Sequence, residues 1–407
     1  MSNPDHCKYL SRHNAVGGAV AKRKLLIHDV TLRDGEQQAG IVFLPQEKIE
    51  IARQLDRLGV DRIEAGRLDM GDEEIEALRT LTSLGLKAEI WAVTRASVQD
   101  VKKSAEVGVD GVGIVMLAAE RPLAAAGITL DDAIHNALSA ATEARISGLK
   151  ATLLIADSSR LAADTLHRVL KDASASWLLD GIALMDSYGV LTPQGAANLV
   201  VSARGRSDLP IEIHAHNDFG LAVANALSAA EAGASVVHAS MLGLGERVGN
   251  TALEEFAVAA SVLYGFEHDL RLEELAPTAS VVQRIAGVSV AQNKPIIGDS
   301  YSKIESGFVA AEYRNLIRNG EDVRSMFPIP PELFGGSGIN LVVGKYSGPE
   351  NIEHVLAAES IRLDDSGKAE LLRMAKREAV RKHRALERCE IRELASSLAA
   401  RRIGWID

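Results

Sequence analysis

Cysteine is scarce in this sequence, and long apolar runs and an excess of positive charge are missing. Only Cys7 and Cys389 occur among the 407 residues, so neither a disulfide framework nor a thiolate metal cluster is expected, and a reducing, cytoplasmic compartment is the simplest interpretation. No apolar run approaches the roughly 18 residues of a membrane span, which argues against a membrane protein. The formal net charge of −10 argues against a nucleic-acid partner, because nucleic acids select basic surfaces.

Short apolar runs alternate with amphipathic helical stretches over most of the first two thirds of the chain. The helical stretches repeat apolar residues at three- and four-residue spacing and close on glycine. Eight such units predict a parallel (β/α)8 barrel, the TIM barrel of the α/β class. The predicted strands are 25–30, 61–65, 88–93, 111–117, 150–156, 181–186, 210–215 and 235–241.

The barrel is expected to span residues 24–270, with further segments on both sides. Residues 1–23 are polar and basic without the apolar core of a secretory signal, so we predict a flexible tail. The segment 271–350 is rich in proline and glycine and predicts a small mixed linker subdomain. Residues 351–407 alternate charges at helical spacing, which predicts a C-terminal helical subdomain with a solvated or packing surface.

Four potential metal ligands follow predicted strands. His214 and His216 stand two residues apart, so a strand would direct both imidazoles to the same side. Asp34 follows the first predicted strand and Asn250 follows the last. A barrel gathers the carboxyl ends of its strands around one mouth, so these four side chains are expected to converge on one divalent metal. Mixed oxygen and nitrogen ligands suit Mg²⁺, Mn²⁺ or Zn²⁺, and the sequence does not choose among them.

Each of these features also has an ordinary structural explanation. A lone His-x-His pair is more often packing than a metal site, and only its combination with the other strand ends favours a metal. Glu64 and Arg95 fit structural salt bridges as well as a substrate pocket. His28, His238 and His268 are expected to be ordinary core or surface histidines.

Several motifs occur in one order along the chain, and together they resemble the metal-dependent TIM-barrel enzymes of the DRE-TIM metallolyase superfamily. The resemblance is to isopropylmalate, homocitrate and citramalate synthases, in particular homocitrate synthase-type chains without a regulatory domain. It implies a Claisen-type condensation of an acyl-CoA with a 2-oxo acid. The motifs are TLRDGEQQAG (31–40), IEAG (63–66), DSYGVLTP (186–193), HAHNDFGLA (214–222), GLGERVGN (243–250), KPIIG (294–298), ESG (305–307) and GKYSG (344–348).

The resemblance assigns roles to particular residues. Asp34, His214 and His216 would be metal ligands, and Asn250 would be a further ligand. Arg33 would polarise the keto oxygen of the bound 2-oxo acid. A 2-oxo acid chelates a metal through its carboxylate and keto oxygens, so metal and guanidinium would together stabilise the developing alkoxide. Glu36 would take part in catalysis by orienting these groups. The residues that would bind the substrate are Gln37, Glu64, Arg95, Ser187 and Tyr346.

Departures from the family pattern fall on its acid and base positions. Ala156 stands where these synthases usually carry glutamate, and Ile304 and Val309 stand where they usually carry histidine. A Claisen condensation needs a base to remove a weakly acidic methyl proton, so this base would have to be elsewhere. Asp157 is the candidate that directly follows Ala156. The others are Lys303, Tyr313 and Tyr346.

Two reaction classes therefore remain open. Retained motifs in the later subdomain favour an acyltransferase with a shifted base, whereas the lost acid and base positions favour a thioester-independent lyase or aldolase on the same metal and 2-oxo acid site. A degenerate barrel with only a binding or regulatory role is disfavoured by the intact metal ligands. By resemblance we also expect a homodimer, in which residues 301–313 cap the partner's site.

Overall fold

The computed structural model describes residues 9–15 and 23–403 of the chain. These residues divide into two compact units, the first with residues 11–15 and 23–290 and the second with residues 9–10 and 291–403. Most of the predicted tail lies outside the described residues, and its described part contains one 3-10 turn, Arg12–Ala15. Within these two segments, helices long and apolar enough to cross a membrane are absent.

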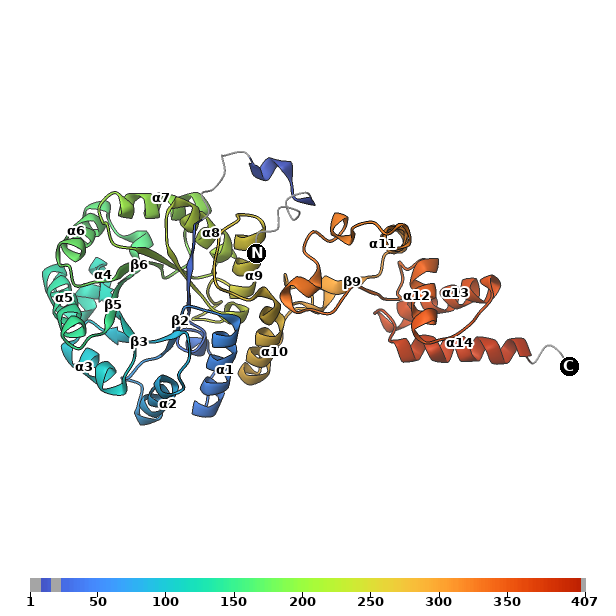
Figure 1. Cartoon of the computed structure of the whole chain (residues 1–407), viewed down its shortest axis with the longest axis horizontal. Helices are drawn as coiled ribbons and strands as arrows, with labels where there is room; N and C mark the ends of the chain where they lie inside the picture. Colours follow the sequence, from blue (N-terminus) through green and yellow to red (C-terminus); the bar gives the residue numbers. More distant parts are fainter. Residues whose placement is uncertain (1–8, 16–22, 404–407) are drawn as a thin grey trace. The chain divides into compact units, whose positions relative to one another are not determined.

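The first unit is built around eight parallel strands that close into a barrel in chain order (Figure 1). This topology confirms the predicted (β/α)8 fold, and the strands predicted at 111–117, 150–156 and 181–186 have the observed bounds. The eighth strand ends two residues earlier than predicted, because the chain then enters a 3-10 turn at Met241–Gly243. The strands are β1 Leu26–Asp29, β2 Arg62–Gly66, β3 Glu89–Arg95, β4 Gly111–Leu117, β5 Lys150–Ala156, β6 Gly181–Asp186, β7 Ile211–Ala215 and β8 Val236–Ala239.

Two interior glycines make room for large side chains inside the barrel. A Cβ atom at Gly111 of β4 would lie 2.5 Å from the ring of Trp91, and one at Gly181 of β6 would lie 2.6 Å from Oε1 of Glu212. Trp91 and Glu212 are fully buried. The small residues therefore let bulky aromatic and charged groups fill the barrel in layers, as is usual for this fold.

Several helices of the first unit begin at a capping side chain, and several end at a glycine. Ser97 and Thr129 accept hydrogen bonds from backbone N–H groups in the first turns of their helices. Gly59 ends the first helix with φ 94°, a left-handed conformation that favours glycine. The helices are α1 Pro45–Leu58, α2 Asp72–Ser83, α3 Val98–Val107, α4 Glu120–Ala126, α5 Leu130–Ile146, α6 Ala163–Ala175, α7 Pro193–Arg204, α8 Ala222–Ala232, α9 Leu253–Val262 and α10 Leu275–Ala286.

Helix α10 packs against α1 and belongs to the barrel unit. Residues 275–286 lie within the predicted linker segment 271–350, whereas the contacts divide the chain after Val290. The predicted boundaries at residues 270 and 350 therefore remain predictions. The contacts group residues 291–350 and 351–403 into one unit.

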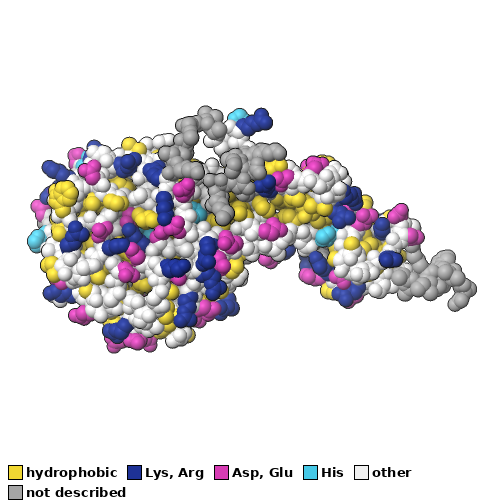
Figure 2. Space-filling model, viewed as in Figure 1, with side chains coloured by type: hydrophobic (Ala, Val, Ile, Leu, Met, Phe, Trp, Pro, Cys, Tyr) yellow, Lys and Arg dark blue, Asp and Glu magenta, His cyan; other side chains and the backbone are white. Residues whose placement is uncertain are grey.

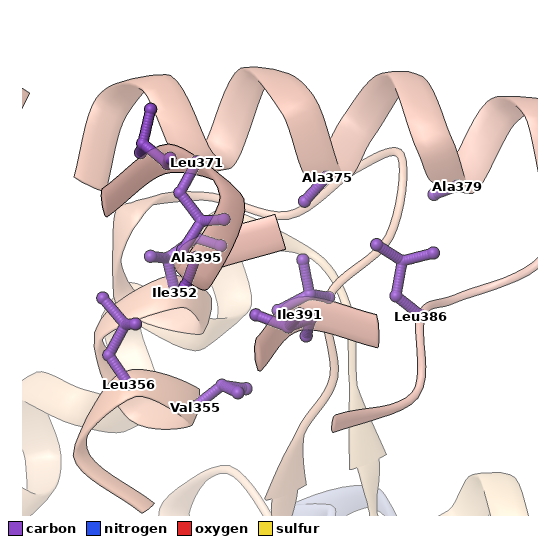
Figure 3. Close-up of a cluster of buried hydrophobic side chains, with 11 residues drawn as sticks. Ile352, Val355, Leu356, Leu371, Ala375, Ala379, Leu386, Ile391 and Ala395 are labelled. Carbon is purple, nitrogen blue, oxygen red and sulfur yellow. The ribbon is translucent and has the colours of Figure 1, made fainter. Parts of the chain in front are cut away.

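The second unit combines a small parallel sheet with four helices. Apolar side chains of its last three helices form one buried core, which includes Ile352, Leu371, Ala375 and Ile391 (Figure 3). The elements are β9 Lys303–Ile304, β10 Asn340–Leu341, α11 Gly307–Asn319, α12 Pro349–Ala358, α13 Asp365–Lys382 and α14 Arg388–Ile403.

The charged surface of the barrel is mixed in sign. Lysine and arginine side chains are interspersed with aspartate and glutamate side chains over the face seen in Figure 2. A mixed surface of this kind differs from the basic face of a nucleic-acid-binding domain.

Candidate metal centre

Four polar side chains converge at the carboxyl ends of β1, β7 and β8. Asp34 follows β1 in a turn, where its backbone N–H donates to the carbonyl oxygen of Val30 over 2.9 Å. His214 lies on β7 and His216 directly follows that strand. Asn250 follows β8 and pairs with His216 in an isolated β-bridge. None of the four ligand candidates is more than 6% exposed, so the fold buries the predicted ligands together.

The polar atoms of these side chains are close enough to share one cation. Nε2 of His214 lies 3.2 Å from Oδ2 of Asp34, and Nε2 of His216 lies 3.8 Å from the same oxygen. The two Nε2 atoms are 3.3 Å apart. Oδ1 of Asn250 is buried and has no hydrogen-bond partner in the described part of the chain. One carboxylate, two imidazoles and an unpartnered amide oxygen fit a hard or borderline divalent cation.

Electrostatics keep these ligands in the forms that bind metal. Burial would raise the pKa of Asp34, but Arg33 and the two histidines outweigh it and hold this pKa well below its usual range. Burial lowers the pKa of His214, and it lowers the pKa of His216 to about 4. At neutral pH the site therefore offers a carboxylate and two uncharged imidazoles.

Arg33 lies next to the ligand cluster and is held on two sides. Its Nε donates to Oε1 of Glu64, and its Nη1 donates to Oε1 of Gln37 over 2.8 Å. Nη1 also lies 3.6 Å from Oδ1 of Asp34. The structure thus brings three of the predicted substrate-binding residues, Arg33, Gln37 and Glu64, to one place beside the ligand candidates.

Both carboxylate oxygens of Glu36 are bound by residues in α1 and in the segment just before it. Oε1 accepts a hydrogen bond from the backbone N–H of Phe43 over 2.7 Å, and Oε2 lies 2.8 Å from Nζ of Lys48. Lys48 is buried and also pairs with Glu74. In this structure Glu36 anchors the start of α1, and its predicted catalytic role remains a prediction.

Asp157 and Ser187 meet at the ends of β5 and β6. The Oγ of Ser187 accepts a hydrogen bond from the backbone N–H of Asp157 over 2.9 Å. The Asp157 carboxylate forms a two-pronged pair with the guanidinium of Arg160, at distances from 2.6 to 3.0 Å. That guanidinium stacks 4.0 Å from the centre of the Tyr188 ring. The candidate base is therefore ion-paired in this structure.

Four other predicted or substituted positions have different surroundings. Arg95 is directed to Asp100 at the start of α3, with contacts of 2.7 and 3.0 Å, and its side chain is 64% exposed. In the second unit, Tyr346 is 72% exposed. Ile304 is buried in an apolar cluster of that unit, and Val309 packs against it.

Sequence reasoning gave no role to two arginines that fix this side of the barrel mouth. Arg160 pairs with Asp157, as described above. Arg247 donates through Nη2 to the carbonyl oxygen of Ser187 over 2.7 Å and pairs with Asp218. The spacing of Asp157 and Arg160, three residues apart, was an available signal. The left-handed backbone of Arg247, with φ 61°, was not visible in the sequence.

Comparisons with known proteins agree with this geometry. A family model described as HMGL-like matches residues 24–282. The chain belongs to this family. It is 35% identical to the (R)-citramalate synthase CimA of Methanocaldococcus jannaschii over 340 residues, which cover 83% of this chain and 68% of that protein. It is also 35% identical to homocitrate synthase 1 of Nostoc sp. over 379 residues, 91% of this chain and 97% of that protein. The predicted resemblance to these synthases is thus confirmed.

A solved structure of the same barrel type is the HMG-CoA lyase of Bacillus subtilis. It superposes on this HMGL-like protein with a TM-score of 0.62 and 18% sequence identity, and the match covers 68% of this chain and 97% of the lyase. At this identity the likeness concerns the fold alone.

Proposed function

We propose that this protein is a divalent-metal-dependent acyltransferase that condenses an acyl-CoA with a 2-oxo acid by Claisen-type chemistry. One observation carries the proposal. Arg33 lies beside the Asp34, His214 and His216 cluster in a chain that is 35% identical to a citramalate synthase and to a homocitrate synthase. A 2-oxo acid presents a carboxylate next to a keto oxygen, and a cation and a guanidinium can recognise this pair together.

Asp34, His214, His216 and Asn250 would hold the cation. When bound, the cation supplies Lewis-acid polarisation of the keto oxygen. Mg²⁺, Mn²⁺ and Zn²⁺ all suit this donor set, and we propose no preference among them.

Arg33, Gln37 and Ser187 would bind and orient the 2-oxo acid. Glu64 accepts from Nε of Arg33 and Gln37 accepts from Nη1. Nη2 has no hydrogen-bond partner among the described residues, so it is available to an oxygen on which negative charge develops. A cavity of about 300 Å³ opens beside Arg33 and Gln37, and Val42 and Phe43 contribute apolar lining. None of the four ligand candidates lines this cavity, so it could hold only the part of a substrate that extends from Arg33 away from the cation.

The base of the proposed reaction is Asp157, in place of the missing glutamate at Ala156. Ile304 and Val309 belong to an apolar cluster, so these positions supply no acid or base. Asp157 would have to release Arg160 before it accepts a proton. The Arg160 side chain is 50% exposed, so it has room to turn into solvent, but its release breaks a two-pronged ion pair and the stacking contact with Tyr188.

The test is release of free coenzyme A thiol from acetyl-CoA in the presence of a panel of 2-oxo acids. The panel contains pyruvate, 2-oxoisovalerate, 2-oxoglutarate and oxaloacetate, each with Mg²⁺, Mn²⁺ or Zn²⁺ and with an EDTA control. We expect metal-dependent release with one acid. Asp157→Asn should lower kcat strongly, whereas Asp164→Asn, an exposed substitution at the start of α6, should not.

A thioester-independent lyase or aldolase is the second candidate. The observation that favours it is the combination of Ala156 with the ion-paired state of Asp157. If metal-loaded protein releases no thiol with any acid of the panel, this candidate replaces the first. Cleavage of 2-oxo acid aldol adducts, followed by pyruvate release, would then be the assay.

We also propose a homodimer in which residues 301–313 cap the site of the partner subunit, and a cytoplasmic location. The family resemblance supports the first proposal, and the scarcity of cysteine supports the second. Light scattering coupled to gel filtration should give twice the chain mass of 43.5 kDa. A monomer at micromolar concentration would reject the dimer.

A further inference from the structure

A second buried polar cluster lies inside the barrel, next to the metal ligands. It consists of His28 on β1, Glu64 on β2, Glu212 on β7 and His238 on β8, and none of these residues is more than 2% exposed. His238 is the strand neighbour of both His28 and the ligand His214 in the barrel register. Four polar side chains at such depth need mutual partners.

The cluster consists of two chains of hydrogen bonds with the same order of groups. In the first, Arg33 donates to Oε1 of Glu64, and Nε2 of His28 lies 3.2 Å from Oε2 of the same carboxylate. Burial would raise the pKa of Glu64, but Arg33 and His28 hold it well below its usual range, so the carboxylate is ionised. An ionised carboxylate only accepts, so Nε2 of His28 is the donor.

The second chain repeats this pattern around Glu212. Nη1 of Arg62 donates to Oε1 of Glu212 over 2.9 Å, and Nε2 of His238 donates to Oε2 over 2.8 Å. The hydroxyl of Thr152 also donates to Oε1 over 3.0 Å. Each carboxylate in the cluster therefore has one guanidinium and one imidazole as partners.

The two imidazoles join these chains. The rings of His28 and His238 stack with centroids 4.3 Å apart and an angle of 14° between their planes. The edge of Trp91 packs against His28, and His238 packs edge-on against His214 with centroids 5.5 Å apart. The stacked pair thus contacts the metal ligand His214 directly and reaches Arg33 through Glu64.

Charge balance argues against a second cation in this cluster. Ligand atoms of His28, Glu212 and His238 lie within 4.8 Å of one another, which is close enough to consider a metal. Two guanidinium groups already balance the two carboxylates of the cluster. A divalent cation would add two uncompensated charges in the barrel interior, at a large cost in free energy.

We propose that His28 is a positioning residue of the reaction, which acts by fixing Glu64 and through it the guanidinium of Arg33. This inference rests on the proposed function, because it assigns Arg33 to the keto oxygen. The carboxylate of Glu64 has two oxygens, and Arg33 engages only one of them through Nε. His28 engages the other, so the carboxylate and the guanidinium are each held in one orientation. Loss of the donor would leave a buried carboxylate oxygen unsatisfied and free to draw Arg33 away from the substrate.

The test compares three substitutions at His28 in the full-length protein loaded with Mn²⁺. His28→Gln retains an N–H donor at nearly the same reach, His28→Asn retains an amide that is too short, and His28→Leu removes the donor. We expect His28→Leu and His28→Asn to lower kcat for thiol release by about 10- to 100-fold, with KM for the 2-oxo acid within about twofold of wild type. His28→Gln should recover most of kcat.

Matched measurements separate positioning from a general loss of stability. Bound Mn²⁺, measured by elemental analysis, should be unchanged in all three variants. His268→Leu removes a partly buried histidine that is bonded to Ser261, outside the barrel interior, and should leave kcat unchanged. Equal kcat in His28→Leu and wild type, or a kcat loss that His28→Gln does not repair, would overturn the proposal. If His28→Leu fails to fold, His28→Asn and His28→Gln still decide it.

A readout without turnover distinguishes this inference from the proposed function itself. Imidazole N–H protons bonded to buried carboxylates give proton resonances far downfield, and we expect one such signal to vanish in His28→Leu and a second to remain from His238. If wild type releases no thiol but shows both signals, the proposed function fails while the geometry of the cluster stands. If the His28 signal is absent from wild type, the positioning proposal fails.

Discussion

Oδ2 of Asp34 accepts a hydrogen bond from Nδ2 of Asn250 over 3.1 Å, although the two residues are 216 positions apart in the sequence. The same oxygen lies 3.2 Å from Nε2 of His214 and 3.8 Å from Nε2 of His216. Asp34 is therefore the common partner of all the other ligand candidates. A substitution at this one position tests the whole site.

Asp34→Asn should abolish or strongly weaken divalent metal binding. The change preserves the size of the side chain but removes the negative charge that a cation needs, so we expect at least about a tenfold loss of Mn²⁺ affinity by calorimetry. Asp218→Asn is the matched control, because Asp218 lies near the same mouth but is paired with Arg247. Equal Mn²⁺ affinity in Asp34→Asn and wild type would reject the metal centre.

Metal affinity should be nearly independent of pH from about pH 8 to about pH 6 and should fall below about pH 5. The reason is that burial lowers the pKa of His216 to about 4, and the pKa of His214 is also lowered. Protons compete with a cation only when they occupy the ligand atoms of the metal-free protein. With these lowered histidine pKa values, the imidazoles are protonated only at acidic pH. Mn²⁺ titrations at four pH values provide the measurement. A rise in affinity of about threefold between about pH 6 and pH 7 would instead indicate one ligand with the ordinary histidine pKa.

The fold and the convergence of the four ligand candidates were accessible from the sequence, because each depends on a periodic or local signal. Alternation of apolar strands with amphipathic helices fixed the order of the barrel, and strand parity placed His214 and His216 on one side. Parity also places His28 inside the barrel, since strand neighbours alternate between the interior and the helices. The sequence alone nevertheless indicates only an ordinary core or surface histidine at position 28, because the partner of His28, Glu64, lies on another strand.

The choice of partner by each charged group was not accessible in the same way. Glu36 lies within the same motif as Asp34, yet its carboxylate binds Lys48 on α1. Asp157 follows a strand end like the ligands do, yet its carboxylate binds Arg160. Such choices depend on rotamers and on distances between loops, which motif order does not encode.

Asp29→Asn should stabilise the barrel at alkaline pH and have little effect in mild acid. Asp29 is fully buried at the end of β1, and burial raises the pKa of its carboxyl to about 7. Hydrogen bonds from the N–H and the hydroxyl of Thr31 lower this pKa, but burial outweighs them. Between about pH 4 and pH 7 the folded protein therefore binds more protons than the unfolded chain. The contribution of this group to stability is complete below about pH 4 and is lost as the pH rises through 7. The free energy of unfolding of wild type should thus fall across this range by up to about 4 kcal/mol relative to Asp29→Asn.

Urea unfolding at about pH 5.5 and pH 8, followed by tryptophan fluorescence, provides the measurement for Asp29. Trp91 is fully buried in the barrel, so its emission should report on this unit. Asp208→Asn, at an exposed aspartate, should unfold like wild type at both pH values. An Asp29→Asn variant that is less stable than wild type at pH 8 would show that the ionised carboxylate is stabilising in the fold.

Gly249→Ala should weaken metal binding without touching a ligand. Gly249 adopts φ 97°, and a Cβ atom there would lie 1.8 Å from the carbonyl oxygen of Gly243. That carbonyl accepts the backbone N–H of Asn250 over 3.0 Å, so the clash must displace the segment that carries Asn250. Displacement of about 1 Å is enough to spoil a ligand arrangement. We therefore expect reduced Mn²⁺ affinity together with a lower melting temperature.

Gly220→Ala separates this effect from the strain of the backbone alone. Gly220 adopts φ 72°, but nothing lies within 4 Å of a Cβ atom built there. Alanine at this position should cost about 1 kcal/mol for the left-handed conformation and leave Mn²⁺ affinity unchanged. Equal losses of affinity in the two variants would mean that stability, not the place of Asn250, limits metal binding. A loss confined to Gly249→Ala would tie the amide of Asn250 to the metal centre, because this residue directly follows the altered backbone.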